Sequence, residues 1–300
     1  MSTAVWVVLL SLLVVGLIGY ASVVALLFWL QGRLVYPLER VRGLPRNSAA
    51  DRFEPVTVRT ADGLVLTGRY APASQTDAYT VVLFHGNGED LSQRARIAHD
   101  LLAAGHGVYL AEYRGYGGAP GRPSEAGLYA DGRAALNFVT ARTHRVAVHG
   151  FSLGTGVAVR MASEYQTLAA LILEAPFTSI ADIARARFPL FAFRCMVRDR
   201  YDNLSTIGHV RAPVLVCGGL RDPVIPPEHF TRLYSAVRSA RRLALFEGAG
   251  HVDVWEMGAR EHVLRFLEEL RRTGALAGSE VGCPAWSVDE HVQRSCRSLD

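Results

Sequence analysis

A serine flanked by glycines stands at the junction of a predicted strand and a predicted helix. Ser152 is the centre of the run Gly150 to Gly154, which follows the apolar segment 145–149 and precedes the small, apolar segment 155–162. The two glycines leave room for a sharp turn that projects the serine hydroxyl from the end of the strand. The helix start offers the backbone N–H of Leu153 and a positive dipole end, and both suit a developing oxyanion. The pattern indicates a nucleophilic serine, although an ordinary turn serine is the competing interpretation.

Two downstream loops can supply the partners of such a serine, namely a histidine base and a carboxylate that orients it. Asp222 follows the apolar segment 214–217, and His251 follows the apolar segment 243–246. Both segments are predicted strands, and open α/β sheets place their ligand sites beyond the carboxyl ends of strands. We therefore predict a catalytic triad of Ser152, His251 and Asp222. Glu174, which also follows a predicted strand, is the rival for the acid.

Strand and helix patterns alternate along the chain and would bring these loops to one edge of a sheet. Segments 56–60 and 64–70 alternate in polarity around a turn, which predicts a β-hairpin. Further strands are predicted at 80–84, 107–112, 146–149, 168–173, 214–217 and 243–246, with helical patterns between or after them. This order predicts an α/β fold with a mostly parallel central sheet and helices on both faces.

Two segments depart from this alternation. Residues 177–209 are aromatic, rich in arginine and broken by Pro189, which predicts a short lid over the carboxyl edge of the sheet. Residues 274–300 contain several glycines and little periodicity, which predicts a disordered tail. The catalytic domain is then expected at 56–273, after a juxtamembrane linker at 32–55.

Residues 1–31 are predicted to form a transmembrane anchor. Positions 4–30 carry no charged side chain, and about 20 apolar residues suffice to cross a bilayer. Trp6 and Trp29 fit interfacial positions near the two ends. A cleaved signal peptide is the alternative, but it would have a basic residue before a shorter apolar core and small residues at the cleavage site.

Arginines follow the predicted span, whereas no basic residue precedes it. They are Arg33, Arg40, Arg42 and Arg46. The positive-inside rule then puts the catalytic domain on the cytoplasmic side of a single-pass membrane protein. The same arginines could instead lie on anionic lipid headgroups, or they could belong to a solvated linker.

The composition argues against several other classes of protein. All 32 basic residues are arginine, they are interspersed with acidic residues, and the formal net charge is only +4. Because no nucleic-acid-binding motif is found either, we expect no nucleic acid partner. The four cysteines have neither zinc-ligand spacing nor the pattern of a disulfide framework, and Cys217 is predicted to be a buried core thiol. We expect no metal and no cofactor.

Residues 56 to 272 resemble the α/β-hydrolase superfamily, in which the nucleophile, the acid and the base follow in this chain order. The runs at 113–117, 123–129 and 174–179 add to the resemblance. With its apolar N-terminus, the chain is similar to membrane-anchored ABHD-type serine hydrolases and their bacterial relatives. One departure is Cys217-Gly218, where such proteins often have His-Gly, but that histidine is not part of the triad.

The resemblance implies an α/β-hydrolase fold and a role for each candidate residue. Ser152 would attack an acyl carbonyl, His251 would act as base, and Asp222 would hold the imidazole. The backbone N–H groups of Leu153 and Asn87 would bind the oxyanion.

The predicted function is a membrane-tethered serine hydrolase that cleaves carboxylic esters or thioesters through an acyl-enzyme on Ser152. The apolar N-terminus and the aromatic lid favour a small-molecule or lipid-derived acyl substrate. Two alternatives stay open. One is a serine peptidase of the aminopeptidase type, which would need an acidic pocket for an α-amino group. The other is a non-catalytic binding protein that keeps the fold.

Overall fold

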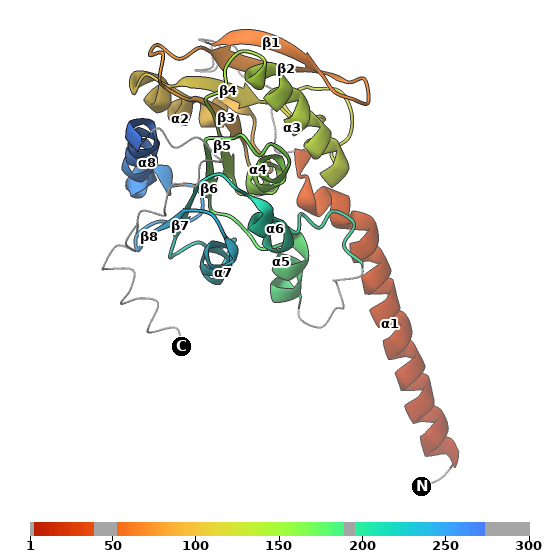
Figure 1. The fold of residues 1–300 in the computed structure, drawn as a ribbon. Coiled ribbons are helices and arrows are strands. Elements are labelled where there is room, and N and C mark those ends of the chain that lie inside the picture. The colour runs from red at the N-terminus through yellow and green to blue at the C-terminus, as the bar shows by residue number, and fades with distance from the viewer. Residues whose placement is uncertain (1–2, 39–52, 189–195, 274–300) are drawn as a thin grey trace.

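The computed structural model of the chain describes residues 3–38, 53–188 and 196–273, and Figure 1 shows their arrangement. Within these ranges the helices are α1 (Thr3–Val35), α2 (Leu91–Ala103), α3 (Glu125–Thr140), α4 (Leu153–Glu164), α5 (Ile180–Arg187), α6 (Asn203–Thr206), α7 (Glu228–Ala236) and α8 (Arg260–Thr273). Two short helical turns are η4 (Ile207–His209) and η5 (Trp255–Ala259).

In the described part of the chain, eight strands form one sheet in the order β1-β2-β4-β3-β5-β6-β7-β8. They are β1 (Glu54–Arg59), β2 (Val65–Ala71), β3 (Thr80–Phe84), β4 (Gly107–Ala111), β5 (Val146–Phe151), β6 (Ala170–Glu174), β7 (Val214–Gly219) and β8 (Arg241–Phe246). Strand β2 pairs antiparallel with β1 and with β4, whereas the other neighbours pair parallel. The predicted fold class, an α/β fold with a mostly parallel sheet, is confirmed.

Apolar sequence on both sides of the central strands explains why helices cover both faces. Strands β3, β4, β5 and β6 are buried along their whole length. One face packs against α2 and α8, and the other packs against α3, α4 and α7, so that two apolar cores form. Helix α8 shows the pattern well, because its buried residues Val263, Phe266, Leu267 and Leu270 recur at helical spacing on one side.

Helix α1 leaves the domain beside α5 and α6 as a long rod (Figure 1). It runs to Val35, past the predicted end of the anchor at residue 31, through Gly32, and it ends two residues before Pro37. Its most apolar stretch has a mean hydropathy of 2.6, and none of that stretch is buried in the protein. The helix thus has the length and composition of a membrane span, which a signal sequence near an N-terminus also has.

The residues just after α1 dock onto the domain. Tyr36 is buried, and its hydroxyl lies 2.9 Å from the hydroxyl of Tyr201, which comes from the segment before α6. Burial raises the pKa of Tyr36 well above its usual value. The start of the predicted linker at 32–55 is therefore helical and packed, and residues 39–52 lie outside the described residues.

The segment predicted as a lid contains two short helices, α5 and α6. The sequence did not lead us to expect α5, although Ser179 caps it by accepting a hydrogen bond from the backbone N–H of Asp182 at 3.0 Å. Residues 189–195 of the predicted lid and the predicted tail 274–300 lie outside the described residues. Cys217 is a buried free thiol in β7, as predicted.

We predict that Tyr36→Phe and Tyr201→Phe each lower the free energy of unfolding by about 1–3 kcal/mol, because each leaves a buried hydroxyl without this partner. The double variant should lose little more than either single variant, since both hydroxyls are then gone. Urea unfolding of the detergent-solubilised protein measures all three. Strictly additive losses would contradict a direct bond between the two tyrosines.

Candidate active site

Three loops at the carboxyl ends of parallel strands bring Ser152, Asp222 and His251 together. Ser152 follows β5, Asp222 follows β7, and His251 follows β8. The Nδ1 atom of His251 lies 2.7 Å from Oδ2 of Asp222, and its Nε2 atom lies 3.0 Å from Oγ of Ser152. Because a carboxylate only accepts hydrogen bonds, Nδ1 donates to Asp222 and Nε2 is left to accept from the serine hydroxyl. The predicted triad residues thus form one hydrogen-bonded chain.

The turn that carries Ser152 is strained, as the sequence pattern requires. Ser152 has a φ of 48°, a left-handed conformation that side chains other than glycine rarely adopt. Its backbone N–H donates to the carbonyl of Glu174 at 3.0 Å, which holds the turn against β6. A Cβ atom at position 150 would lie 2.7 Å from Cβ of Ala158, and one at position 154 would collide with the carbonyl oxygen of Phe84. Both positions therefore require glycine, because neighbouring atoms lie too close for a side chain.

Backbone N–H groups fix the side chain of Asp222, and a carboxylate fixes the loop that carries His251. Oδ1 of Asp222 accepts hydrogen bonds from the N–H groups of Val224 at 2.7 Å and Ile225 at 2.9 Å, so that only Oδ2 is left to face His251. Asp253 accepts from the N–H of Gly250 at 2.7 Å and ties down the loop that carries His251. These bonds fix the orientation of the imidazole before any substrate binds.

The two predicted oxyanion donors line the same cavity as Ser152. Leu153 is the first residue of α4, so its N–H has no carbonyl partner one turn back in the helix. Asn87 lies in the loop after β3, which Glu89 holds by accepting from the N–H of Gly86 at 2.9 Å. A Cβ atom at position 86 would lie 2.8 Å from the ring of Phe151, so this loop packs closely on the serine turn.

His85 holds the same loop through polar contacts of both its ring nitrogens. Its Nδ1 lies 2.8 Å from the carbonyl oxygen of Gly86, and its Nε2 lies 3.0 Å from Oε1 of Glu112. Burial alone would lower the pKa of His85, but the hydrogen bond and the charge of Glu112 raise it above its usual value. His85 therefore holds the loop and does not face Ser152.

Glu174, the rival candidate for the acid, pairs with His149 and not with His251. Its Oε2 lies 3.0 Å from Nε2 of His149, and both side chains are almost fully buried under the serine turn. Burial alone would raise the pKa of Glu174, but the hydrogen bond with His149 and the charges of His149 and Arg94 hold it below its usual range. The geometry places Asp222, and not Glu174, on His251.

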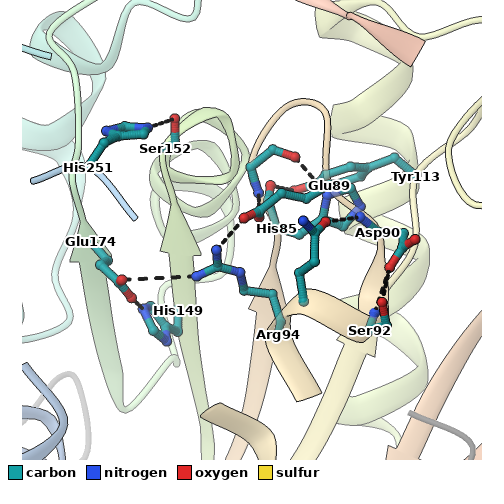
Figure 2. Close-up of polar contacts among 12 residues, drawn as sticks. His85, Glu89, Asp90, Ser92, Arg94, Tyr113, His149, Ser152, Glu174 and His251 are labelled. Atoms are coloured by element: carbon teal, nitrogen blue, oxygen red, sulfur yellow. Dashed lines mark hydrogen bonds and ion pairs between the residues drawn. The ribbon is translucent and has the colours of Figure 1, made fainter. Parts of the chain in front are cut away.

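A buried arginine that the sequence analysis missed connects these parts. Figure 2 shows Arg94 between Glu89 and Glu174. Its Nη2 donates to Oε1 of Glu89, and its Nη1 lies 4.0 Å from Oε1 of Glu174. The guanidinium also lies over the ring of Phe151, 3.9 Å from the centroid. Arg94 thus joins the loop after β3 to the end of β6. The available signal was an arginine within the apolar stripe of α2 that includes Leu91 and Ala98.

A cavity of about 280 Å³ opens onto the serine. Its walls are mostly apolar and come from the end of α1, from α5 and from the loops beside the triad. The lining residues from α1, from α5 and from the residue after α5 are Leu27, Phe28, Gln31, Leu34, Val35, Ile180, Ile183, Ala184, Arg187 and Phe188. Within the part of the chain that the structure describes, no group of three or more His, Cys, Asp or Glu side chains could hold a metal ion.

Comparison with known proteins agrees with this fold. A family model described as serine aminopeptidase, S33, matches residues 75–203. The uncharacterized protein Rv2307c of Mycobacterium tuberculosis is 37% identical over 258 residues, which cover 83% of this chain and 92% of that protein. The α/β-hydrolase domain-containing protein WAV2 of Arabidopsis thaliana is 29% identical, with 82% of this chain and 90% of that protein covered.

Solved structures of similar fold include the esterase Pf2001 of Pyrococcus furiosus, with a TM-score of 0.63 and 20% identity over 77% of this chain and 97% of that chain. A monoacylglycerol lipase of Paleococcus ferrophilus has a TM-score of 0.52 and 20% identity, with 73% and 98% covered. A parallel sheet that carries a serine on a strained strand-to-helix turn is typical of α/β-hydrolases. With these relatives, the chain belongs to the α/β-hydrolase superfamily.

We predict that Arg94→Met lowers the free energy of unfolding by about 3–5 kcal/mol, because it leaves buried carboxylates without their cation. Arg96→Met, on the same helix, is the matched control. Arg96 is 71% exposed and pairs with Glu256 at the surface, so its loss should cost less than about 1 kcal/mol. Urea unfolding compares the two variants, and equal losses would contradict the assigned role of Arg94.

The lowered pKa of Glu174 predicts how Glu174→Gln depends on pH. The folded protein binds a proton at Glu174 less readily than the unfolded chain, so the ionised carboxylate stabilises the fold above the unfolded pKa of about 4.3. This contribution is lost as the pH falls from about 5 through the folded pKa. The stability difference between wild type and Glu174→Gln should therefore be larger at pH 7 than at pH 4 in chemical unfolding. A difference that does not change with pH would contradict the assignment.

Proposed function

We propose that this hydrolase cleaves carboxylic esters or thioesters of apolar acyl groups through an acyl-enzyme on Ser152. The observation that carries the proposal is the hydrogen-bonded chain of Asp222, His251 and Ser152, which ends at an apolar cavity. The triad order and the elbow geometry match those of serine hydrolases with this fold.

In the proposed reaction, Oγ of Ser152 attacks the acyl carbonyl carbon while Nε2 of His251 takes its proton. The N–H groups of Leu153 and Asn87 stabilise the resulting oxyanion. When the intermediate collapses, the bond to the alcohol or thiol breaks, and the leaving group takes the proton from His251. Water then attacks the acyl-enzyme with His251 as base, which releases the carboxylic acid and restores Ser152. Asp222 stabilises the imidazolium in both halves.

The cavity favours an acyl group over the free amino end of a peptide. An aminopeptidase binds the α-ammonium group of its substrate, for which a carboxylate is the natural partner. Among the lining residues in the described part of the chain, none is a carboxylate and one is a cation, Arg187. A peptidase is therefore the second candidate function, and it has the support of the serine aminopeptidase family model. A panel of peptide amides measured beside the esters separates the two.

A non-catalytic binding protein is the remaining alternative. The φ of 48° at Ser152 costs on the order of 1–3 kcal/mol, and the hydroxyl that this turn carries lies 3.0 Å from Nε2 of His251. The strain at Ser152, together with the oriented base, supports an active enzyme.

We also propose that α1 anchors the enzyme in a membrane. The helix has 33 residues and its first charged residue is Arg33. The arginines that follow it support a cytoplasmic catalytic domain. Protease digestion of sealed vesicles tests this orientation, because a cytoplasmic domain is protected in right-side-out vesicles and is digested in inverted ones.

We predict that Ser152→Ala lowers kcat on 4-nitrophenyl esters by a factor on the order of 10⁶, because the nucleophile is gone. Its melting temperature should stay within a few degrees of wild type, since the side chain loses one oxygen. A fluorophosphonate should add once to the wild type and not to Ser152→Ala in intact mass spectra. Ser163→Ala, at the other end of α4, is the control and should be labelled like the wild type. A well-folded wild type that takes no label and cleaves no ester would contradict the proposal and favour a binding protein.

A further inference from the structure

The last turns of α1 face the domain along one stripe. Five residues at helical spacing are half-buried, namely Val24, Leu27, Leu30, Gln31 and Val35. Their neighbours around the helix point outward, since Leu26 is 54% exposed and Trp29 is 74% exposed. The end of α1 is therefore part of the domain surface, whereas its first turns are exposed and extend away from the described part of the domain (Figure 1).

Polar contacts fix where this end of α1 lies. Gln31 accepts a hydrogen bond from the backbone N–H of Arg198 at 2.8 Å, and the guanidinium of Arg198 lies over the ring of Phe28, 4.3 Å from its centroid. The carbonyl of Val35 accepts from Nδ2 of Asn87 at 3.3 Å. Asn87 is also the residue whose backbone N–H is proposed to bind the oxyanion. The helix is thus held both by the segment that follows α5 and by the rim of the active site.

The cavity beside Ser152 lies between this end of α1 and helix α5. From α1 it is lined by Leu27, Phe28, Gln31, Leu34 and Val35, and from α5 by Ile180, Ile183 and Ala184. Ser152 and Leu153 also line this cavity, so the proposed nucleophile borders the mostly apolar space.

We propose that the end of α1 is one wall of a site for a linear fatty acyl chain, and that it sets the length of the chain accepted. The inference rests on the proposed function, because the carbonyl of this chain must lie at Ser152. An unbranched hydrocarbon fits the lining, since each methylene buried against these side chains adds to binding and no charged partner is needed.

With α1 in a bilayer as proposed, the length of the helix puts this site next to the membrane surface. A helix of 33 residues is about 50 Å long at ~1.5 Å per residue, whereas a hydrocarbon core is ~30 Å thick and needs about 20 residues. The turns from Leu27 to Val35 then lie at the membrane surface. A chain that leaves the bilayer along α1 would meet a mostly apolar cavity, whose lining includes Ser152 and the exposed Phe188.

A larger side chain on α1 should narrow the proposed acyl site and so test the inference. We expect Leu27→Trp, in the full-length detergent-solubilised protein, to lower the ratio of kcat/KM for 4-nitrophenyl dodecanoate over 4-nitrophenyl acetate by about tenfold or more. Loss of room for two methylenes accounts for this size, at about fourfold for each. Leu26→Trp adds the same bulk to the exposed side of α1 and is the matched control, so its ratio should equal that of the wild type.

A second variant keeps the inference testable if Leu27→Trp does not fold. Leu27→Ala enlarges the site, so it should move the preferred ester to a longer chain. Unchanged chain-length preference in both Leu27 variants, with wild-type melting temperatures, overturns the inference and leaves the proposed function standing. A wild type that hydrolyses no ester of any length, and takes no fluorophosphonate, means that the proposed function itself has failed.

The delivery of the ester distinguishes two sources of the same acyl chain. The full-length protein is reconstituted in phosphatidylcholine vesicles that carry the dodecanoate ester. If the wild-type rate follows the mole fraction of ester in the lipid, the result supports an acyl site walled by α1 that takes its substrate from the bilayer. If the rate follows the total concentration of ester instead, the result supports the same acyl site with a substrate taken from water. A rate unaffected by Leu27→Trp in both settings overturns the inference.

Discussion

The strained turn at Ser152 is the constraint on which the rest of the structure depends. A left-handed residue between a strand and a helix persists only where its surroundings fix it. Here the glycines at 150 and 154 admit the backbone of neighbouring elements, and the carbonyl of Glu174 holds the N–H of Ser152. The parallel sheet supplies these neighbours, because β3, β5 and β6 end side by side at the same edge.

Buried charge beneath that edge serves the same purpose. Ion pairs without water are costly to assemble, and removal of one member leaves the others uncompensated. Glu89, Arg94, Glu174 and His149 link the loop after β3 to the floor under the serine turn (Figure 2). The rigidity of the candidate site therefore comes from electrostatics as well as from packing, and the two loops that would bind an oxyanion are connected through it.

The sequence was sufficient for the architecture and for the residues at strand ends. Periodicity located the strands, and parallel pairing then brought Ser152, Asp222 and His251 to one edge. It was not sufficient for Arg94, because an arginine in an amphipathic helix is indistinguishable by pattern from one that extends its head to water. Nor could it show that Tyr36 meets Tyr201, since a contact across 165 positions leaves no local trace. Helix α5 was missed because its eight residues are too few for periodicity.

The continuity of α1 has a kinetic consequence. The helix is unbroken from Thr3 to Val35, and contacts on the domain clamp its end. With this helix in a bilayer, as proposed, Ser152 stays at a constant height above the lipid and cannot move away as it could on a flexible linker. The enzyme then searches in two dimensions. Its encounter rate is set by lateral diffusion and by the surface density of substrate, so the same number of substrate molecules reacts faster on a small membrane than on a large one.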